Sequence, residues 1–340
     1  MKKKVCFYSN EGYESIMRQQ YSIQDVNILR DLDFDVVIAS KFSEIPWNSD
    51  LYFSWWGGGS VFPLIVAKLR GKPIVVVAGG NEVLFYRDSV TQKTAGYLDA
   101  PWYKKIAIRL VLKCADQLIV VSKFMQKGIK CLTNRSVSLA YNSIAVGDFD
   151  DFGLEREYVT SIFNFDPGVF ALKRGEIFLR AIPYILEDFP TQKFLIIGSD
   201  IEKYPDIRCL VDGLNINSSI KFMNSLSNKD IPYWFNKSIA YVQISDTETF
   251  GVSVAEAMST KTPVVVSNKG ALPEIAGSFG EYVDHNSPKS VAAGIVKILK
   301  AGSNTELLES ARNRIVRKFS YSERKKIIGD IVFNLIEKNK

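Results

Sequence analysis

The sequence predicts an α/β protein with two Rossmann-like domains, each built on a doubly wound parallel sheet. Three observations support this fold class. The chain has 340 residues, which is more than one hydrophobic core normally supports. Short runs rich in Val and Ile alternate with longer segments of helical periodicity, as they do in βαβ units. The alternation stops at residues 140–155, a region rich in Asn, Gly and Asp, and then begins again.

Each half of the chain supplies its own set of elements. In the first half we predict strands at 5–9, 35–39, 51–56, 74–78 and 117–122, and helices near 16–32, 61–70, 102–114 and 123–132. In the second half we predict strands at 159–163, 193–197, 220–222, 240–244, 263–267 and 280–283, and helices near 175–187, 229–236, 252–259, 289–301 and 305–316. The strand runs are almost continuously apolar, so helices are expected on both faces of each sheet.

This order of elements predicts a domain at 1–150 and a second at 151–320. A last amphipathic segment has no strand after it, and we expect residues 321–340 to form a helix that packs back toward the first domain. Ligands of doubly wound sheets bind outside the carboxyl ends of the strands. Two such domains facing each other would enclose a central cleft, so the loops that follow the strands are the places to look for functional residues.

Composition and charge exclude several classes of protein. Hydrophobic residues make up 46% and charged residues 24%, which is typical of a folded soluble protein. The net charge of +6 is too small for a nucleic-acid binder and fits an acidic substrate or an anionic surface better. Four widely spaced cysteines, and no apolar run of membrane-spanning length, predict a cytoplasmic protein with reduced thiols.

The loop after the predicted strand 240–244 carries the chemistry. It reads Ser245-Asp-Thr-Glu-Thr-Phe-Gly251 and leads into a helix, with Thr249 as the predicted N-cap. The amides at a helix start favour phosphate, and Glu248 and Glu256 flank this start. A ligand with phosphate in its middle and hydroxyls at both ends, such as a sugar nucleotide, fits these groups. Two glutamates eight residues apart are equally consistent with ordinary solvated helix positions.

A longer pattern surrounds these glutamates. The run Glu248-Thr-Phe-Gly-Val-Ser-Val-Ala-Glu256-Ala-Met is followed by Pro263-Val-Val-Val-Ser and by Gly270-Ala-Leu-Pro273-Glu274-Ile. This pattern resembles the donor-site signature of glycosyltransferase family 4, whose members are retaining enzymes with the GT-B fold. The resemblance implies transfer of a hexosyl unit from a UDP- or GDP-sugar to a glycan or lipid-linked acceptor, with no metal ion or other cofactor. It also implies a role in cell-envelope polysaccharide biosynthesis.

The resemblance assigns roles to individual residues. It implies that Glu248 contacts hydroxyls of the transferred sugar, that Glu256 binds the ribose diol, and that Lys173 grips the departing diphosphate. The catalytic candidates are thus Glu248 and Lys173, and the donor-binding candidates are Glu256, Phe250, Gly251, Val252, Arg174 and Thr249.

The chain departs from the family pattern in two loops. The expected Gly-Arg pair of the first loop in the second domain appears as Asn164-Phe165, so either Arg174 supplies the missing charge or fewer cations hold the leaving group. In the first domain, the expected His-Gly appears as Ala78-Gly-Gly-Asn-Glu82. The candidates for sugar or acceptor contacts there are Gly79, Gly80, Asn81, Glu82 and Gly58, with plain turn chemistry as the alternative. The only histidine, His285, is expected to be a solvated loop residue.

A basic stripe in the first half suggests a membrane contact. Lys105, Arg109 and Lys113 recur every four residues, with Lys104 beside them and aromatic residues just upstream. Such a helix face can dock on anionic lipid headgroups at the inner side of the cell membrane; the alternative is a solvated face on a core helix. Two alternative functions remain: a partner subunit that binds sugar nucleotides without turnover, and a GT-B hydrolase or epimerase.

Overall fold

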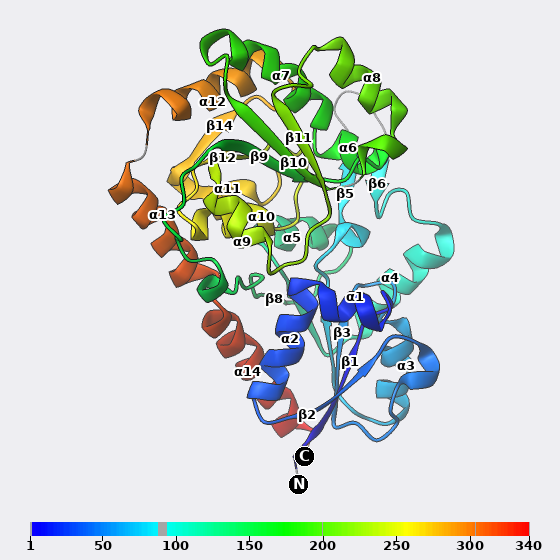
Figure 1. Cartoon of the computed structure of the whole chain (residues 1–340). Coiled ribbons are helices and arrows are strands. Elements are labelled where there is room, and N and C mark those ends of the chain that lie inside the picture. Colours follow the sequence, from blue (N-terminus) through cyan, green and yellow to red (C-terminus); the bar gives the residue numbers. More distant parts are fainter. Residues whose placement is uncertain (1, 88–93, 199, 303, 340) are drawn as a thin grey trace. The chain divides into compact units, whose positions relative to one another are not determined.

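The computed structural model describes residues 2–87, 94–198, 200–302 and 304–339. The chain divides into two compact units (Figure 1). The first comprises Met1–Ser143 together with Phe319–Lys340, and the second comprises Ile144–Lys318. Among the described residues, no helix has both the length and the apolar character needed to cross a membrane.

A parallel sheet forms the centre of the first unit. Within the described residues its strand order is β2-β1-β3-β4-β7-β8. These strands are β1 (Lys4–Tyr8), β2 (Asp35–Ala39), β3 (Leu51–Trp55), β4 (Ile74–Val77), β7 (Gln117–Val120) and β8 (Val137–Leu139). The helices are α1 (Tyr13–Arg18), α2 (Gln20–Asp31), α3 (Val61–Leu69), α4 (Trp102–Cys114), α5 (Lys123–Gly128) and α14 (Tyr321–Lys338).

Three local features of the first unit differ from the sequence prediction. The predicted helix near 16–32 is two helices, because Gln19 adopts an extended conformation between them. The short edge strand β8 lies at residues where no strand is predicted. An antiparallel pair, β5 (Phe85–Arg87) with β6 (Thr94–Gly96), was also missed. Strands of three residues contain too few positions for alternation to be recognised.

The second unit repeats the architecture with the strand order β11-β10-β9-β12-β13-β14. Its strands are β9 (Tyr158–Phe163), β10 (Lys193–Gly198), β11 (Ile220–Asn224), β12 (Ser238–Gln243), β13 (Val264–Ser267) and β14 (Gly280–Val283). Its helices are α6 (Pro167–Leu172), α7 (Gly175–Asp188), α8 (Pro205–Gly213), α9 (Ile231–Asn236), α10 (Val252–Ser259), α11 (Leu272–Ala276), α12 (Pro288–Ala301) and α13 (Thr305–Lys318). The helices α6, α8 and α11 were not predicted.

Helices cover both faces of the second sheet. The crossovers β9-α7-β10 and β12-α10-β13 run in opposite directions along the sheet, so right-handed connections place α7 and α10 on opposite faces. Helices α7 and α12 pack against each other (Figure 1), and Phe178 of α7 belongs to the same buried core as Phe194 and Ile196 of β10. The predicted fold class, two Rossmann-like parallel-sheet domains, is confirmed.

Both sheets reverse their winding direction in the middle. The reversal lies between β1 and β3 in the first unit and between β9 and β12 in the second. At such a switch point the loops after the two strands diverge and leave a crevice, where ligands of these folds bind. The loops after β1, β3, β9 and β12 are therefore the positions from which functional side chains can converge.

The C-terminal helix α14 packs on α2 within the first unit. Arg324 of α14 is almost fully buried, and its guanidinium donates to both carboxylate oxygens of Asp25 over 2.6 and 2.8 Å. Asp25 also accepts from the indole of Trp55 over 2.9 Å, and Arg324 donates to the carbonyl of Ala140. This network ties the chain's last helix to β3 and to the end of β8.

Candidate functional site

The loop between β12 and α10 is shaped by two glycines. Gly251 has φ 102°, in the left-handed region, and is the N-cap of α10. Gly270 has φ 57°, and a Cβ there would lie 2.4 Å from the backbone nitrogen of Glu248. The amide of Ala271 donates to the carbonyl of Glu248 over 2.9 Å. The backbone at Glu248 is therefore held from the neighbouring loop. The prediction that Thr249 is the N-cap was wrong, because the helix begins at Val252.

The Glu248 carboxylate lies at the switch point and has three hydrogen-bond partners among the described residues. Lys173, which directly follows α6, places its Nζ 2.5 Å from Oε2. Gln243, the last residue of β12, donates to the same oxygen over 2.8 Å, and the amide of Thr249 donates to Oε1 over 3.1 Å. The two catalytic candidates, 75 residues apart in the chain, are thus in direct contact. Both side chains remain partly open, 23% exposed for Lys173 and 16% for Glu248.

Gln243 was missed in the sequence, as was its neighbour Tyr241. The phenol of Tyr241 donates to Oε1 of Gln243 over 3.0 Å, so the amide is oriented with its NH2 group toward Glu248. Burial raises the pKa of Tyr241, and the charges of Glu248 and Glu256 raise it further. The signal was available, because two polar side chains stand at alternate positions near the carboxyl end of an apolar strand.

Glu256 lies in α10 and is buried, with 8% of its surface exposed. Burial raises the pKa of its carboxyl group from 4.5 to about 7. Among the described residues this carboxylate has no hydrogen-bond partner, so its oxygens are available to donors from a ligand. Both glutamates are close enough to Tyr241 for their charges to raise its pKa, and Phe250, Gly251 and Val252 lie between them in the chain, at the start of α10.

Arg174 has a different environment from Lys173. It adopts a left-handed conformation with φ 54° at the start of α7, and its side chain is only 9% exposed. Its Nη2 lies 3.2 Å from Asp246, whose other carboxylate oxygen lies 2.6 Å from Nε2 of His285. The expectation that His285 is solvated was wrong, since 6% of it is exposed. Arg174 and His285 thus clamp Asp246, two residues before Glu248.

The replaced Gly-Arg pair has a structural explanation. Phe165 is buried against Phe163, Phe170, Tyr204 and Phe222. Asn164 beside it is exposed. At the position where the family pattern has Arg, this chain therefore has Phe165, which is part of an aromatic core. Among the described residues, Lys173 is the partly exposed cation that contacts Glu248.

The first unit has a cavity of about 720 Å³ at its own switch point. Asn10 and Glu11 from the loop after β1 line it, together with Trp56 and Gly58 from the loop after β3 and Glu82 after β4. The Oε1 atom of Glu82 accepts from the amide of Gly57 over 3.1 Å, and burial raises the pKa of Glu82 to about 7. Aromatic rings and carboxylates that share one cavity suit a ligand with hydroxyl groups.

The two glycines after β4 serve the packing of this cavity's wall. A Cβ on Gly79 would lie 2.8 Å from the ring of Trp55, and one on Gly80 would lie 2.2 Å from the ring of Trp56. Both glycines are buried and do not line the cavity. Trp56 has φ 74°, and its buried Nε1 has no hydrogen-bond partner among the described residues. The side chain of Asn81 lies outside the described part of the structure.

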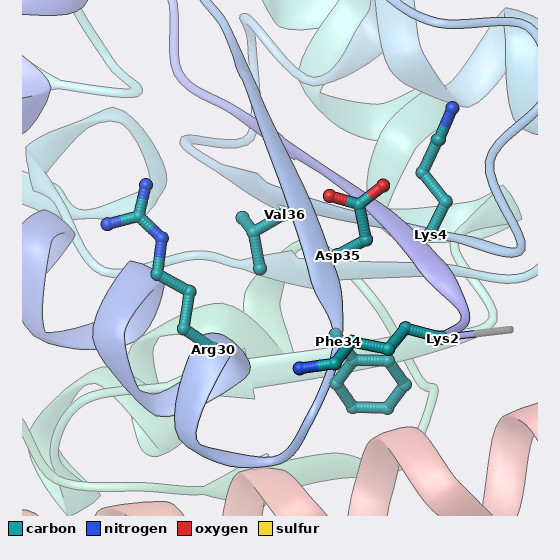
Figure 2. Close-up of a pocket in the computed structure, with 6 residues that line it drawn as sticks. All are labelled: Lys2, Lys4, Arg30, Phe34, Asp35 and Val36. Carbon is teal, nitrogen blue, oxygen red and sulfur yellow. The ribbon is translucent and has the colours of Figure 1, made fainter.

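A second hollow, of about 600 Å³, lies at the opposite end of the first sheet (Figure 2). Lys2, Lys4 and Arg30 surround it, beside Phe34, Asp35 and Val36 at the amino ends of β1 and β2. Lys2 pairs with Asp33 at the exposed surface. Strand amino ends are not where these folds bind ligands, so we do not assign this hollow to the functional site.

The comparisons with known proteins all find similarity to glycosyltransferases. Residues 168–316 match the family model described as glycosyl transferases group 1. The matched segment contains Lys173, Glu248 and Glu256, together with the start of α10.

Similarity to whole proteins extends further along the chain. An uncharacterized glycosyltransferase of Methanocaldococcus jannaschii is 27% identical over 226 residues, which cover 60% of this chain but only 56% of that protein. The O-antigen chain mannosyltransferase RfbU of Salmonella typhimurium is 22% identical, over 92% of this chain and 94% of its own length. The crystal structure of Anabaena HepE in complex with UDP superposes with a TM-score of 0.77 at 15% identity, covering 98% of this chain and all of that one. The fold is GT-B.

Proposed function

We propose that the chain is a retaining glycosyltransferase that moves a hexosyl unit from a nucleotide-diphosphate sugar to a glycan or lipid-linked acceptor. The contact between Lys173 and Glu248 at the switch point of the second unit carries this proposal. It unites a cation for a diphosphate with a carboxylate for sugar hydroxyls, beside the start of α10. The match to group 1 glycosyl transferases and the likeness to a structure that contains UDP support it.

The donor would use the groups around α10 in order. The amides at a helix start have no partners within the helix and carry partial positive charge, so they favour the diphosphate. Lys173 would exchange its contact with Glu248 for one with the diphosphate. Glu248 would then accept hydrogen bonds from the sugar hydroxyls, while Glu256 would accept from the ribose diol. Hydrogen bonds to ionised carboxylates are the stronger kind.

The proposed reaction keeps the configuration of the anomeric carbon. An acceptor hydroxyl attacks on the face from which the diphosphate departs, so the new glycosidic bond replaces the bond to phosphate and the hydroxyl proton passes to the leaving phosphate oxygen. Negative charge develops on the diphosphate. Lys173 and the α10 amides would stabilise that charge more in the transition state than in the ground state.

The cavity of the first unit is the proposed acceptor site. The carboxylates of Glu11, Glu82 and Asp99 line it, and they can accept hydrogen bonds from acceptor hydroxyls. Because the pKa of Glu82 is raised to about 7, both its protonated and ionised forms are present near neutral pH, and it can donate as well as accept. The unpartnered Nε1 of Trp56 is a further donor to a ligand oxygen.

Donor binding and product configuration test the proposal. Thermal shift with a panel of UDP- and GDP-sugars should show stabilisation by one donor, because a ligand that binds only the folded state raises stability by mass action. NMR of the product should show the donor's anomeric configuration, and EDTA should leave the rate unchanged. An inverted product would overturn the retaining assignment, and free sugar released without acceptor would indicate a hydrolase.

One observation favours a second candidate function. The aromatic packing of Phe165 removes a cation from the loop after β9, which weakens the grip on a departing diphosphate. A partner subunit that binds the sugar nucleotide without turnover would tolerate that loss. Calorimetry that shows donor binding, with no product from any acceptor in a membrane extract, would favour this candidate.

A further inference from the structure

Two neighbouring helices of the first unit carry apolar residues on their outward faces. In α3, Leu64 and Val66 are buried against the core, as expected for a helix that covers a sheet. Phe62, Ile65 and Leu69 on the same helix are exposed. Their spacing, three and then four residues, puts them on one side of the helix. This outward side therefore presents apolar side chains to the surroundings.

The helix α4 repeats the pattern. Ile108 and Val111 are buried inward, whereas Tyr103, Ile106 and Leu110 are exposed at the same spacing of three and four residues. The two helices contact each other on one side of the first unit (Figure 1). Phe62 and Tyr103 also line the same cavity, so the two stripes meet at its rim. We call these six residues and Trp102, which is 75% exposed, the α3–α4 face.

The segments that form this face carry only basic charges, whereas the carboxylates of Glu11, Glu82 and Asp99 lie in the cavity at its rim. Residues 60–76 and 100–115 contain seven Lys and Arg and no Asp or Glu. Lys68 pairs with Asp116, and Lys105 bends away to donate to the carbonyl of Leu98. Arg70, Lys104, Arg109 and Lys113 remain exposed. Of the basic stripe predicted from the sequence, Lys105 is thus half-buried and tied to the carbonyl of Leu98, while the apolar residues that accompany the other cations were mostly missed.

We propose that the α3–α4 face docks on the surface of an anionic lipid bilayer. Exposed apolar patches rimmed by polar residues mark interaction sites. Aromatic side chains favour the level of the headgroups, and lysine and arginine near them are attracted to anionic lipid. The cavity of the first unit opens at the rim of this face. If this cavity is the acceptor site, as in the proposed function on which this step rests, docking would present it with a lipid-linked acceptor.

A second copy of the chain fits the face less well. A two-fold interface brings the same patch of both subunits together. Here it would set the exposed arginines and lysines of one copy against those of the other, with no carboxylate in either segment to balance them. Charge complementarity thus favours an anionic membrane.

Co-sedimentation of the full chain with vesicles tests the docking. We expect binding to phosphatidylcholine vesicles that contain phosphatidylglycerol, and little binding to phosphatidylcholine alone. Raising the salt from about 0.1 M to about 1 M shortens the screening length from about 10 Å to about 3 Å, and binding should fall. The double variant Leu69→Glu, Leu110→Glu should lower the partition coefficient at least roughly tenfold, because two apolar contacts with the bilayer are lost.

The control is Leu307→Glu, the same substitution at an exposed leucine of the second unit. It should bind as the unaltered chain does, and thermal unfolding should be unchanged in all variants because each leucine is at least 44% exposed. Equal binding to both vesicle types, or an equal loss in the control, would overturn the proposal. So would a dimer in ultracentrifugation that the double variant dissociates. No nucleotide sugar is present, so the result is independent of whether the chain transfers a sugar.

Discussion

Nζ of Lys173 lies 2.5 Å from Oε2 of Glu248, across the point where the second sheet reverses direction. The lysine directly follows α6, and the glutamate lies in the loop after β12. The two residues are far apart in the sequence, so the fold of the sheet brings them together. The side-chain amide of Gln243 donates a second hydrogen bond to the Glu248 carboxylate. In the proposed reaction this pair would separate, with Lys173 turning to the phosphate and Glu248 to the hydroxyl groups of the donor.

Removal of the cation should slow the reaction. For Lys173→Met we expect kcat to fall by roughly 10²–10³, the usual effect of removing one donor to developing negative charge. Lys173→Arg should retain part of the rate because it keeps the charge. Single-turnover kinetics with saturating donor would measure the change. The control is Lys297→Met, which breaks only an exposed pair with Glu281; full activity in Lys173→Met would contradict the assignment.

Donor affinity should depend on pH through Glu256. The pKa of its buried carboxyl group is raised to about 7, and ribose hydroxyls bind better to the ionised form. Between about pH 8 and about pH 6 the group becomes protonated, so the donor dissociation constant should rise. In Glu256→Gln binding should be weaker and lose this pH dependence. Calorimetry at several pH values measures both; an unchanged profile in the variant would rule out Glu256 as the source.

Glu256 should also make the stability of the fold depend on pH. The free energy of unfolding should fall as the pH rises, whereas a salt-bridged carboxylate makes it rise. Between pH 4.5, the ordinary pKa of Glu256, and about 7, its pKa in the folded chain, the folded state holds the proton and the unfolded state loses it. The free energy of unfolding should therefore fall across this window, by at most about 3 kcal/mol, and then level off. Glu256→Gln should remove this fall. Urea denaturation at both ends of the window would show it.

Adjacent residues in the loop after β9 should respond differently to an added cation. Asn164→Arg changes an exposed side chain, so we expect unchanged stability and tighter donor binding, by about tenfold if the guanidinium reaches the diphosphate. Phe165→Arg forces a charge into the aromatic cluster and should destabilise the chain by about 3 kcal/mol or more. Thermal unfolding and donor titration of both variants provide the comparison. Equal stability in the two variants would contradict the packing argument.

The buried pair between Asp25 and Arg324 should be essential for the first unit. Asp25→Ala leaves a buried guanidinium without its partner, which typically costs about 3–5 kcal/mol. The neighbouring Lys325→Ala breaks a pair with Asp31 at the surface, and such pairs contribute about 1 kcal/mol or less. Denaturant titration followed by tryptophan fluorescence reports on both, since Trp55 donates to Asp25. Similar losses of stability in the two variants would contradict the prediction that the buried pair stabilises the first unit more than the surface pair does.

Long periodic segments were predictable because their periodicity is local. The helix predicted at 102–114 coincides with α4, and the strand predicted at 193–197 lies within β10. Short elements such as β5, β6 and α6 were missed because a turn or two contains too few positions to reveal a period. The break at Gln19 was missed because nothing in its neighbours forbids helix.

At the candidate site, the sequence alone singled out Glu248, Glu256 and Lys173 because each stands in a recognisable motif, and their roles in binding and catalysis stay predictions. The sequence could not tell that Lys173 pairs with Glu248 while the adjacent Arg174 turns inward to Asp246. Both residues are basic, and only the backbone conformation at the junction of α6 and α7 decides where each side chain points. Nor could the sequence tell that His285 is buried. Those outcomes depend on strand order, which brings loops distant in sequence to one edge of a sheet, and strand order is decided by the packing of the whole unit.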